Sequence, residues 1–256
     1  MARRLSKAFD RFSTIVALRA KLRGRGMSAF QLKEAPDVTV ELRRSARARR
    51  LSLRVSSLDG RVTLTVPKGT PERVARAFAE EKARWLQDAV GRVALPVPVV
   101  IGAELPVEGR PHRIVAGAGR AARLGPGTIE APPGREGPVI ETLCKQIARN
   151  RLDTAVAGYA SDLGRPYGRI TLRDTRSRWG SCSSAGNLMF SWRLALAPAP
   201  VLRYVAAHEV AHLAHMDHSA AFWATCRALC PETDDHRGWL RTHGSRLHSY
   251  QFRTPD

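Results

Sequence analysis

The sequence contains few cysteines and no long apolar run. Its four cysteines, scattered over 256 residues, are too few for the disulfide framework of a small secreted domain. This composition favours the reducing environment of the cytoplasm. No stretch of about 18 apolar residues is present, so neither a membrane span nor a membrane partner is expected. The basic N-terminal residues flank no continuous apolar segment, which argues against a secretory signal peptide.

Acidic residues are also scarce. The 42 Lys and Arg residues outnumber the 23 Asp and Glu residues, and residues 1–50 alone hold fourteen basic against four acidic side chains. A basic arm attracts nucleic acid, so weak nucleic-acid association through this arm is one interpretation. The other is a solvated tail of biased composition, because only six of the basic residues are Lys. Met27 is a second candidate start, which would leave residues 1–26 untranslated.

Two regions are expected before the catalytic segment. Residues 1–37 form the basic extension, which we expect to be flexible. Residues 38–136 are expected to be rich in β-structure with one long helix, running from Thr70 to about Val93. Residues 94–136, rich in Pro, Gly and Val, predict short strands and turns. Alternating apolar residues predict strands at 38–42, 51–55 and 62–66.

Residues 137–250 are expected to form an α+β catalytic domain, with helices packed on a small antiparallel sheet. Helical periodicity extends over about 139–163, and the apolar segments 169–173 and 187–192 predict a β-hairpin. Further helices are expected from Val201 to about Ala214, after Asp217 or Ser219, and after Asp234 or Asp235.

The chemistry is concentrated in residues 208–218, which read HEVAHLAHMDH. His208 and His212 stand four residues apart, so on a helix they share one face and both imidazoles can reach one metal ion. Glu209 stands beside the first histidine and can accept a proton from a water molecule on that ion. The pattern HExxH on a helix is typical of zinc metalloproteases. It predicts a Zn²⁺ site with two histidine ligands and Glu209 as the catalytic base.

The third ligand has several candidates, since a catalytic zinc has three protein ligands and an open position. His218 follows His212 by six residues, which is the metzincin spacing, and it is the favoured ligand. His215 would share the face of a continuing helix, but reaching the same ion from there would strain all three side chains. A distant Asp or Glu is the third alternative, and Cys182 is a fourth that three histidines would make unnecessary.

Other residues of the same types form no clear pattern. Cys226 and Cys230 stand four apart and are interpreted as small apolar residues on a helix. His236, His243 and His248 follow no ligand spacing and are interpreted as surface or capping groups. Residues 117–122 fit a dinucleotide-binding pattern, but glycine and proline follow at once, so this segment is interpreted as a turn.

Several segments around the HExxH pattern match a known family: RSRWGSC at 176–182, GNL at 186–188, WRL at 192–194, YV at 204–205 and FW at 222–223. They resemble the YgjP-like metallopeptidase domain family, zincin-type bacterial zinc hydrolases related to the SprT-like and WLM proteases. The resemblance implies a zincin-like core in which His208, His212 and His218 bind zinc and Glu209 is the catalytic base.

The predicted function is that of a zinc-dependent metallopeptidase, in which zinc-activated water attacks a peptide carbonyl. The substrate is then a peptide or protein. Alternatives are a metal-dependent hydrolase acting on nucleotides or another phosphate substrate, and a DNA-associated protease. The oxyanion of the peptidase reaction needs a further donor. Its candidates are Arg178, Arg193, Tyr204 and His215.

The predicted hairpin before the HExxH helix has two interpretations. In the first, it forms the rim of the cleft, pairs with an extended peptide, and contributes Arg178, Trp179 and Asn187 to substrate binding. In the second, Trp179 fills the core and Gly180 makes a tight turn. The sequence does not discriminate between them.

Overall fold

The computed structural model of the chain describes residues 28–253. The alternative start at Met27 and most of the predicted basic extension therefore lie outside the described residues. The chain divides into two compact units, with the division between Ala94 and Leu95.

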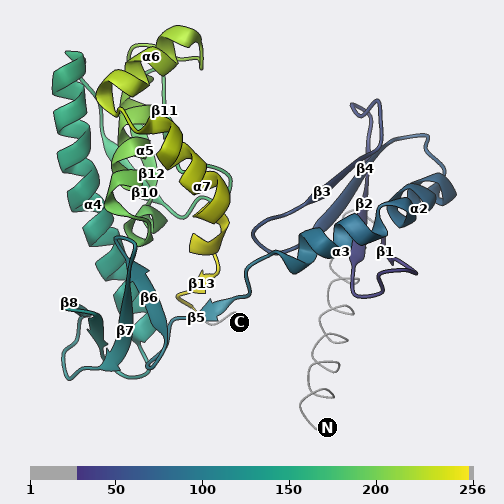
Figure 1. Cartoon of the computed structure of the whole chain (residues 1–256), viewed down its shortest axis with the longest axis horizontal. Helices are drawn as coiled ribbons and strands as arrows, with labels where there is room; N and C mark the ends of the chain where they lie inside the picture. Colours follow the sequence, from purple (N-terminus) through teal and green to yellow (C-terminus); the bar gives the residue numbers. More distant parts are fainter. Residues whose placement is uncertain (1–27, 254–256) are drawn as a thin grey trace. The chain divides into compact units, whose positions relative to one another are not determined.

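The first unit is a four-stranded sheet covered by two helices (Figure 1). The strand order is β1-β2-β4-β3, in which β2 and β4 are parallel and the other pairs antiparallel. Alternation places apolar residues such as Val40 and Leu64 on the face that the helices cover. The elements are β1 (Ser28–Gln31), β2 (Thr39–Ser45), β3 (Ser52–Val55), β4 (Val62–Pro67), α2 (Glu72–Glu81) and α3 (Ala83–Gly91).

Two features of this unit differ from expectation. The end of the predicted extension is a strand, because β1 pairs with β2 and buries Phe30 in the core. The single predicted helix is two helices that meet at Lys82, whose ψ of 10° departs from helical geometry. The break allows Ala79 of α2 and Leu86 of α3 both to be fully buried.

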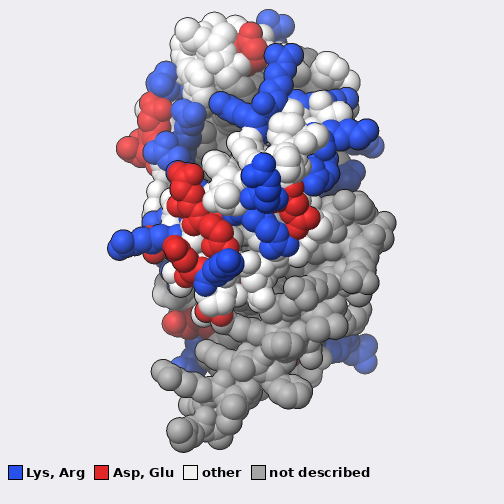
Figure 2. Space-filling model, turned by 90° about the vertical axis from the view of Figure 1, so that its right-hand side faces the viewer, with Lys and Arg blue, Asp and Glu red and all other residues white. Residues whose placement is uncertain are grey.

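Charged side chains of both signs lie on the face of the molecule drawn in Figure 2. Lys and Arg are interspersed there with Asp and Glu and do not form one continuous basic field. In the described residues, the β2–β3 connection exposes Arg47, Arg49 and Arg50. Arg44 is engaged, since its guanidinium donates to the backbone carbonyls of Lys68 and Thr70.

The second unit begins with a small sheet that shares its core with the rest of the unit. Its strands are in the order β6-β7-β9-β8, and its buried residues, including Leu105 and Ile114, share one core with the helices that follow. The division therefore falls at Ala94, whereas the sequence analysis places this segment with the first region, up to residue 136. The strands of this sheet are β6 (Glu104–Val107), β7 (Arg110–Ala116), β8 (Arg123–Gly125) and β9 (Thr128–Ala131), and β5 (Val97–Pro98) precedes them in the chain.

The longest helix, α4 (Glu136–Leu163), supports the rest of this unit. It buries Ile140, Cys144, Ala148 and Leu152, which are four residues apart and form one stripe. This stripe packs against α5 (Ala199–Ala211) and the short 3-10 helix η1 (Trp192–Leu196). Gly164 ends α4 in the left-handed conformation, with φ of 64°.

The predicted hairpin has a different pairing. Strands β10 (Ile170–Arg173) and β12 (Leu188–Ser191) are parallel, and β11 (Gly180–Cys182) is the antiparallel partner of β12. The turn between β11 and β12 contains Gly186 at φ 70°, so the antiparallel pair is made by the nearer segment. The sheet order β10-β12-β11 leaves β11 at an edge.

Three further elements complete the unit, and the predicted α+β class is confirmed. They are α6 (Ala220–Leu229), α7 (Thr233–Leu247) and β13 (Tyr250–Gln251), which pairs with β5. Among the described residues, no helix is long and apolar enough to cross a membrane.

The first turn of α4 packs tightly on the C-terminal segment. A Cβ added at Gly137 would overlap the backbone carbonyl of Phe252, whereas one added at the exposed Gly158 of the same helix would meet nothing. We expect Gly137→Ala to lower the free energy of unfolding by about 1–3 kcal/mol, because backbone must move. Gly158→Ala should raise it by about 0.5–1 kcal/mol through helix propensity. Urea unfolding measures both, and equal stability of the two variants would contradict the packing described.

Candidate metal centre and its cleft

Helix α5 carries the first part of the site into the interior of the second unit. Its sequence is apolar on almost all sides, and it packs against α4, α6, α7 and β11. In this setting Glu209 is only 4% exposed and His212 only 8%. Burying such polar side chains costs free energy, because they lose their contacts with water. Hydrogen bonds or metal coordination can offset this cost.

The chain turns at the end of α5 and brings a third histidine back to the helix. Helix α5 ends at Ala211, earlier than expected, and the backbone N–H of His215 bonds to the Ala211 carbonyl in the turn that follows. The Nε2 atoms of His218 and His208 then lie 3.2 Å apart. One ligand atom from each of His208, His212 and His218 lies within 4.8 Å of the other two. The His215 side chain does not join this group.

His215 contributes to the site through its backbone. Its carbonyl accepts a hydrogen bond of 2.9 Å from Nδ1 of His212. The carbonyl has no proton to give, so Nδ1 of His212 carries the hydrogen and its Nε2 keeps a free lone pair. This arrangement is the usual way in which proteins orient a metal-binding imidazole.

Aromatic rings of α6 pack against the imidazoles. Phe222 stacks on His212 with ring centroids 4.4 Å apart, and Trp223 lies 5.7 Å from His208 and 5.8 Å from His218. The side chain of Ser219 caps α6 by accepting a hydrogen bond from the backbone N–H of Phe222. The cap fixes the start of the helix that supplies these rings.

The imidazoles of α5 are held in the neutral form. Burial, followed by the neighbouring His212 and His218, lowers the pKa of His208 to about 4. Burial also lowers the pKa of His212. Nδ1 of His208 is buried and has no hydrogen-bond partner among the described residues, so ring packing orients this side chain. Neutral imidazoles are the form that binds a metal, and converging nitrogen donors of this kind suit zinc and its neighbours.

Glu209 lies against a glycine of the edge strand. A Cβ built on Gly180 would stand 2.5 Å from Oε1 of Glu209, so only glycine leaves room for the carboxylate. Burial raises the pKa of Glu209 to about 8, and the positive charge of Arg178 acts in the opposite direction. Gly180 is a site residue that the sequence analysis treats only as a turn, and its spacing from Glu209 in the chain carries no signal of this contact.

These groups line one cleft of about 410 Å³. It is bordered by the edge strand β11 on one side and by α5 on the other. The lining residues are Arg178, Trp179, Gly180, Ser181, Cys182, Tyr204, Val205, His208, Glu209, His212, Met216, His218 and Leu240.

The three predicted substrate-binding residues separate in the structure. Arg178 and Trp179 line the cleft. Asn187 does not, because its side chain accepts a hydrogen bond from the backbone N–H of Arg169 and joins the strands near their turn. Trp179 also has the packing role that the sequence analysis considers. A Cβ added at Gly244 of α7 would stand 3.0 Å from its ring, and the ring centroids of Trp179 and His248 are 4.9 Å apart.

The structure also narrows the set of candidate hydrogen-bond donors for the oxyanion. Arg193 is engaged elsewhere: Asp174 binds it through both carboxylate oxygens, and the carbonyls of Leu247 and Tyr250 both accept hydrogen bonds from its Nη1. Arg178 and Tyr204 line the cleft. Burial is the main cause that raises the pKa of Tyr204, so its hydroxyl keeps its proton and can donate. Cys182 lines the cleft but is not part of the three-histidine group.

Comparison with known proteins agrees with this geometry. The profile of the YgjP-like family, metallopeptidase domain, matches residues 49–243, which is about three quarters of the chain. No curated protein and no solved structure matches the chain. A metallopeptidase family implies a metal ion, and the group of His208, His212 and His218 could bind one. The resemblance seen in the sequence is confirmed, and the chain belongs to the YgjP-like metallopeptidase domain family.

Proposed function

We propose that this protein is a zinc-dependent metallopeptidase, with His208, His212 and His218 as zinc ligands and Glu209 as the general base. One observation carries the proposal: three imidazoles and a buried carboxylate meet in a single cleft. Three protein ligands with a position left for water is the arrangement of catalytic zinc sites. When bound, zinc would supply a Lewis acid that acidifies water and polarises a carbonyl.

The residues of the chain account for the proton transfers. Glu209 accepts a proton from the attacking water and returns it to the leaving amine. Glu209 projects from α5 and its side chain packs against Gly180 of β11. This packing keeps the carboxylate in one position for the reaction. Arg178 and Tyr204 are the donors available in the cleft for the negative charge that develops on the carbonyl oxygen.

The edge strand supports a peptide as substrate. All three residues of β11 line the cleft, and β12 is its partner in the sheet. An extended peptide can add to such an edge through backbone hydrogen bonds. The segment 117–122 gives no support to a phosphate substrate, because β8 follows it and there is no helix N-terminus to receive a phosphate.

The substrate class can be tested directly. We expect the purified protein to cleave casein, to lose this activity with a chelator, and to regain it with added Zn²⁺. Nucleoside triphosphates should not be hydrolysed above the chelator-treated background. Peptide release and phosphate release measure the two reactions. Zinc-dependent phosphate release without casein cleavage would replace the peptidase proposal with the phosphohydrolase alternative.

The role of Glu209 predicts a loss of turnover without a loss of metal. We expect Glu209→Gln to lower kcat by about 10²–10⁴-fold, because the amide cannot accept the proton. Its zinc content, measured by atomic absorption, should match that of the unmodified protein. Glu104→Gln is the control, since Glu104 is an exposed carboxylate of β6. Full activity in Glu209→Gln would exclude the proposed base.

Gly180 predicts a positioning effect on the same carboxylate. A methyl group at this position would push Glu209 out of place, so Gly180→Ala should lower kcat by about 10²-fold while zinc is retained. The pH dependence of kcat should also shift, because the environment of Glu209 changes. Gly158→Ala is the matched control, because a methyl group at this exposed position of α4 would meet nothing. An unchanged kcat and pH profile in Gly180→Ala would show that the contact has no bearing on the base.

A further inference from the structure

A second group of metal-binding side chains lies where α6 meets α7. Cys230 ends α6, Glu232 precedes α7, and His236 lies in the first turns of α7. One ligand atom from each of the three lies within 4.8 Å of the other two. The sequence analysis interprets Cys230 as an apolar residue and His236 as a surface group, because a ligand set split across two helices has no recognised spacing.

The backbone of this junction is held by local hydrogen bonds. Thr233 is fully buried, and its hydroxyl donates to the Cys230 carbonyl at 2.7 Å. The backbone N–H of Thr233 bonds to the same carbonyl, and that of His236 bonds to the Glu232 carbonyl, both at 3.1 Å. The three donor side chains therefore project from a backbone whose conformation is already set.

The three donors differ in their exposure to solvent. Cys230 is 5% exposed, His236 is half-buried, and Glu232 is exposed. A divalent cation bound here would pair with both the thiolate and the carboxylate.

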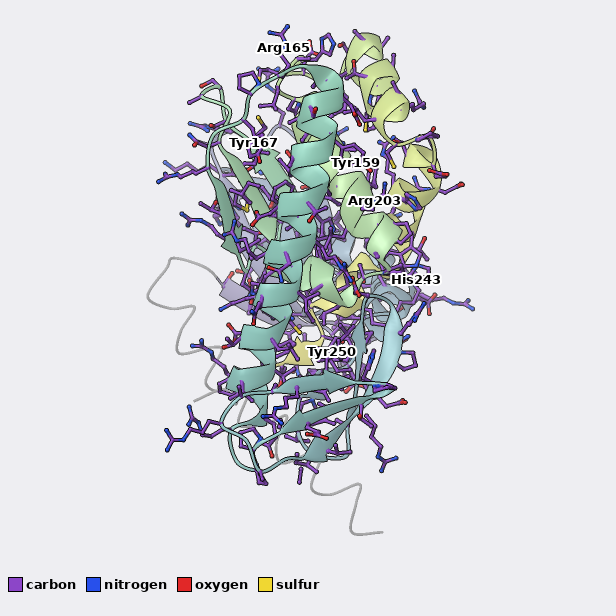
Figure 3. All side chains as sticks on the ribbon, turned by 90° about the vertical axis from the view of Figure 1, so that its left-hand side faces the viewer. Tyr159, Arg165, Tyr167, Arg203, His243 and Tyr250 are labelled. Carbon is purple, nitrogen blue, oxygen red and sulfur yellow. The ribbon has the colours of Figure 1, made fainter. Side chains whose placement is uncertain are left out.

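One competing cation is nearby. Arg203 of α5 lies beside Tyr159 of α4 (Figure 3), and the Tyr159 hydroxyl is the main partner of its guanidinium. Arg203 also acts electrostatically on Cys230 and Glu232. The ion pair recorded at this junction joins Arg227 to Asp234, and among the described residues none within 4.0 Å joins Arg203 to Glu232.

We propose that Cys230, Glu232 and His236 form a second site for a divalent transition metal, with zinc as the best match. Thiolate, carboxylate and imidazole are all zinc ligands, whereas Mg²⁺ and Ca²⁺ prefer oxygen alone. Rotamer adjustments would suffice to bring the donors to the usual bond lengths of about 2.0–2.3 Å. The site shares no ligand with the three-histidine group and does not depend on the proposed peptidase activity.

The second site lies next to the cleft. The ring of His236 is 6.4 Å from that of Tyr204, and the ring of Tyr204 is 6.0 Å from that of His208. A metal on His236 would restrict the ring that packs beside Tyr204, a residue of the cleft wall. The inferred role is therefore to join α6 to α7 and to hold one side of the cleft.

Cobalt substitution tests the proposal, because it distinguishes sulfur ligands from nitrogen ligands. We expect the full-length protein to bind roughly two equivalents of Co²⁺ and to show a thiolate-to-cobalt charge-transfer band in the near ultraviolet. Cys230→Ser should lose the band and roughly one equivalent. His218→Ala should lose roughly one equivalent from the three-histidine site but keep the band.

Two further variants make the result unambiguous. Cys182→Ser is the matched control, since Cys182 lines the cleft of the first site, and its band should be unchanged. His236→Gln should weaken the band, so the proposal stays testable if Cys230→Ser fails to fold. The proposal is overturned if the unmodified protein shows no band, if Cys230→Ser keeps it, or if Cys182→Ser loses it. None of these readings requires turnover, so they are separate from the test of Glu209.

Discussion

The burial of polar groups on an apolar helix is the constraint on which this structure depends. Helix α5 is surrounded by other elements of its unit, yet it brings His208, Glu209 and His212 into that interior. Burial lowers the pKa of both histidines and raises that of the glutamate, so burial alone favours the neutral forms of all three. The charge of a bound cation would favour the carboxylate form of Glu209, which is the form that the proposed base requires. A metal ion can bind these neutral imidazoles without displacing a proton from them. Its coordination would then compensate for the free-energy cost of burying the polar side chains.

Each neighbouring element accommodates the buried polar side chains of α5 in a different way. The turn after α5 supplies a carbonyl for Nδ1 of His212, and α6 supplies the aromatic rings that enclose the imidazoles. Strand β11 has a glycine, Gly180, at the position where a larger side chain would collide with Glu209. Each contribution is local and small, but together they allow one orientation of the donors.

Local patterns made part of this predictable from the sequence. The spacing of His208 and His212 and the period of α4 depend on residues close in the chain, and periodicity reports such features well. The choice of His218 over His215 depends on where α5 ends, and the sequence leaves this open. The parallel pairing of β10 with β12, the contact of Gly180 with Glu209, and the approach of His236 to Cys230 are set by tertiary packing. The spacing of residues in the sequence cannot predict these three contacts.

The place of Gly180 in the chain bears on the order in which the site is assembled. The three histidines lie within a single turn and helix end, so their approach closes only a short loop. Gly180 lies upstream, beyond β12, η1 and most of α5, and it meets Glu209 only when the sheet docks on the helix. During folding, the three histidines can therefore approach one another before the Glu209 carboxylate reaches its position against Gly180. Contacts of low sequence separation form readily during folding, whereas the distant contact comes with the closure of the core.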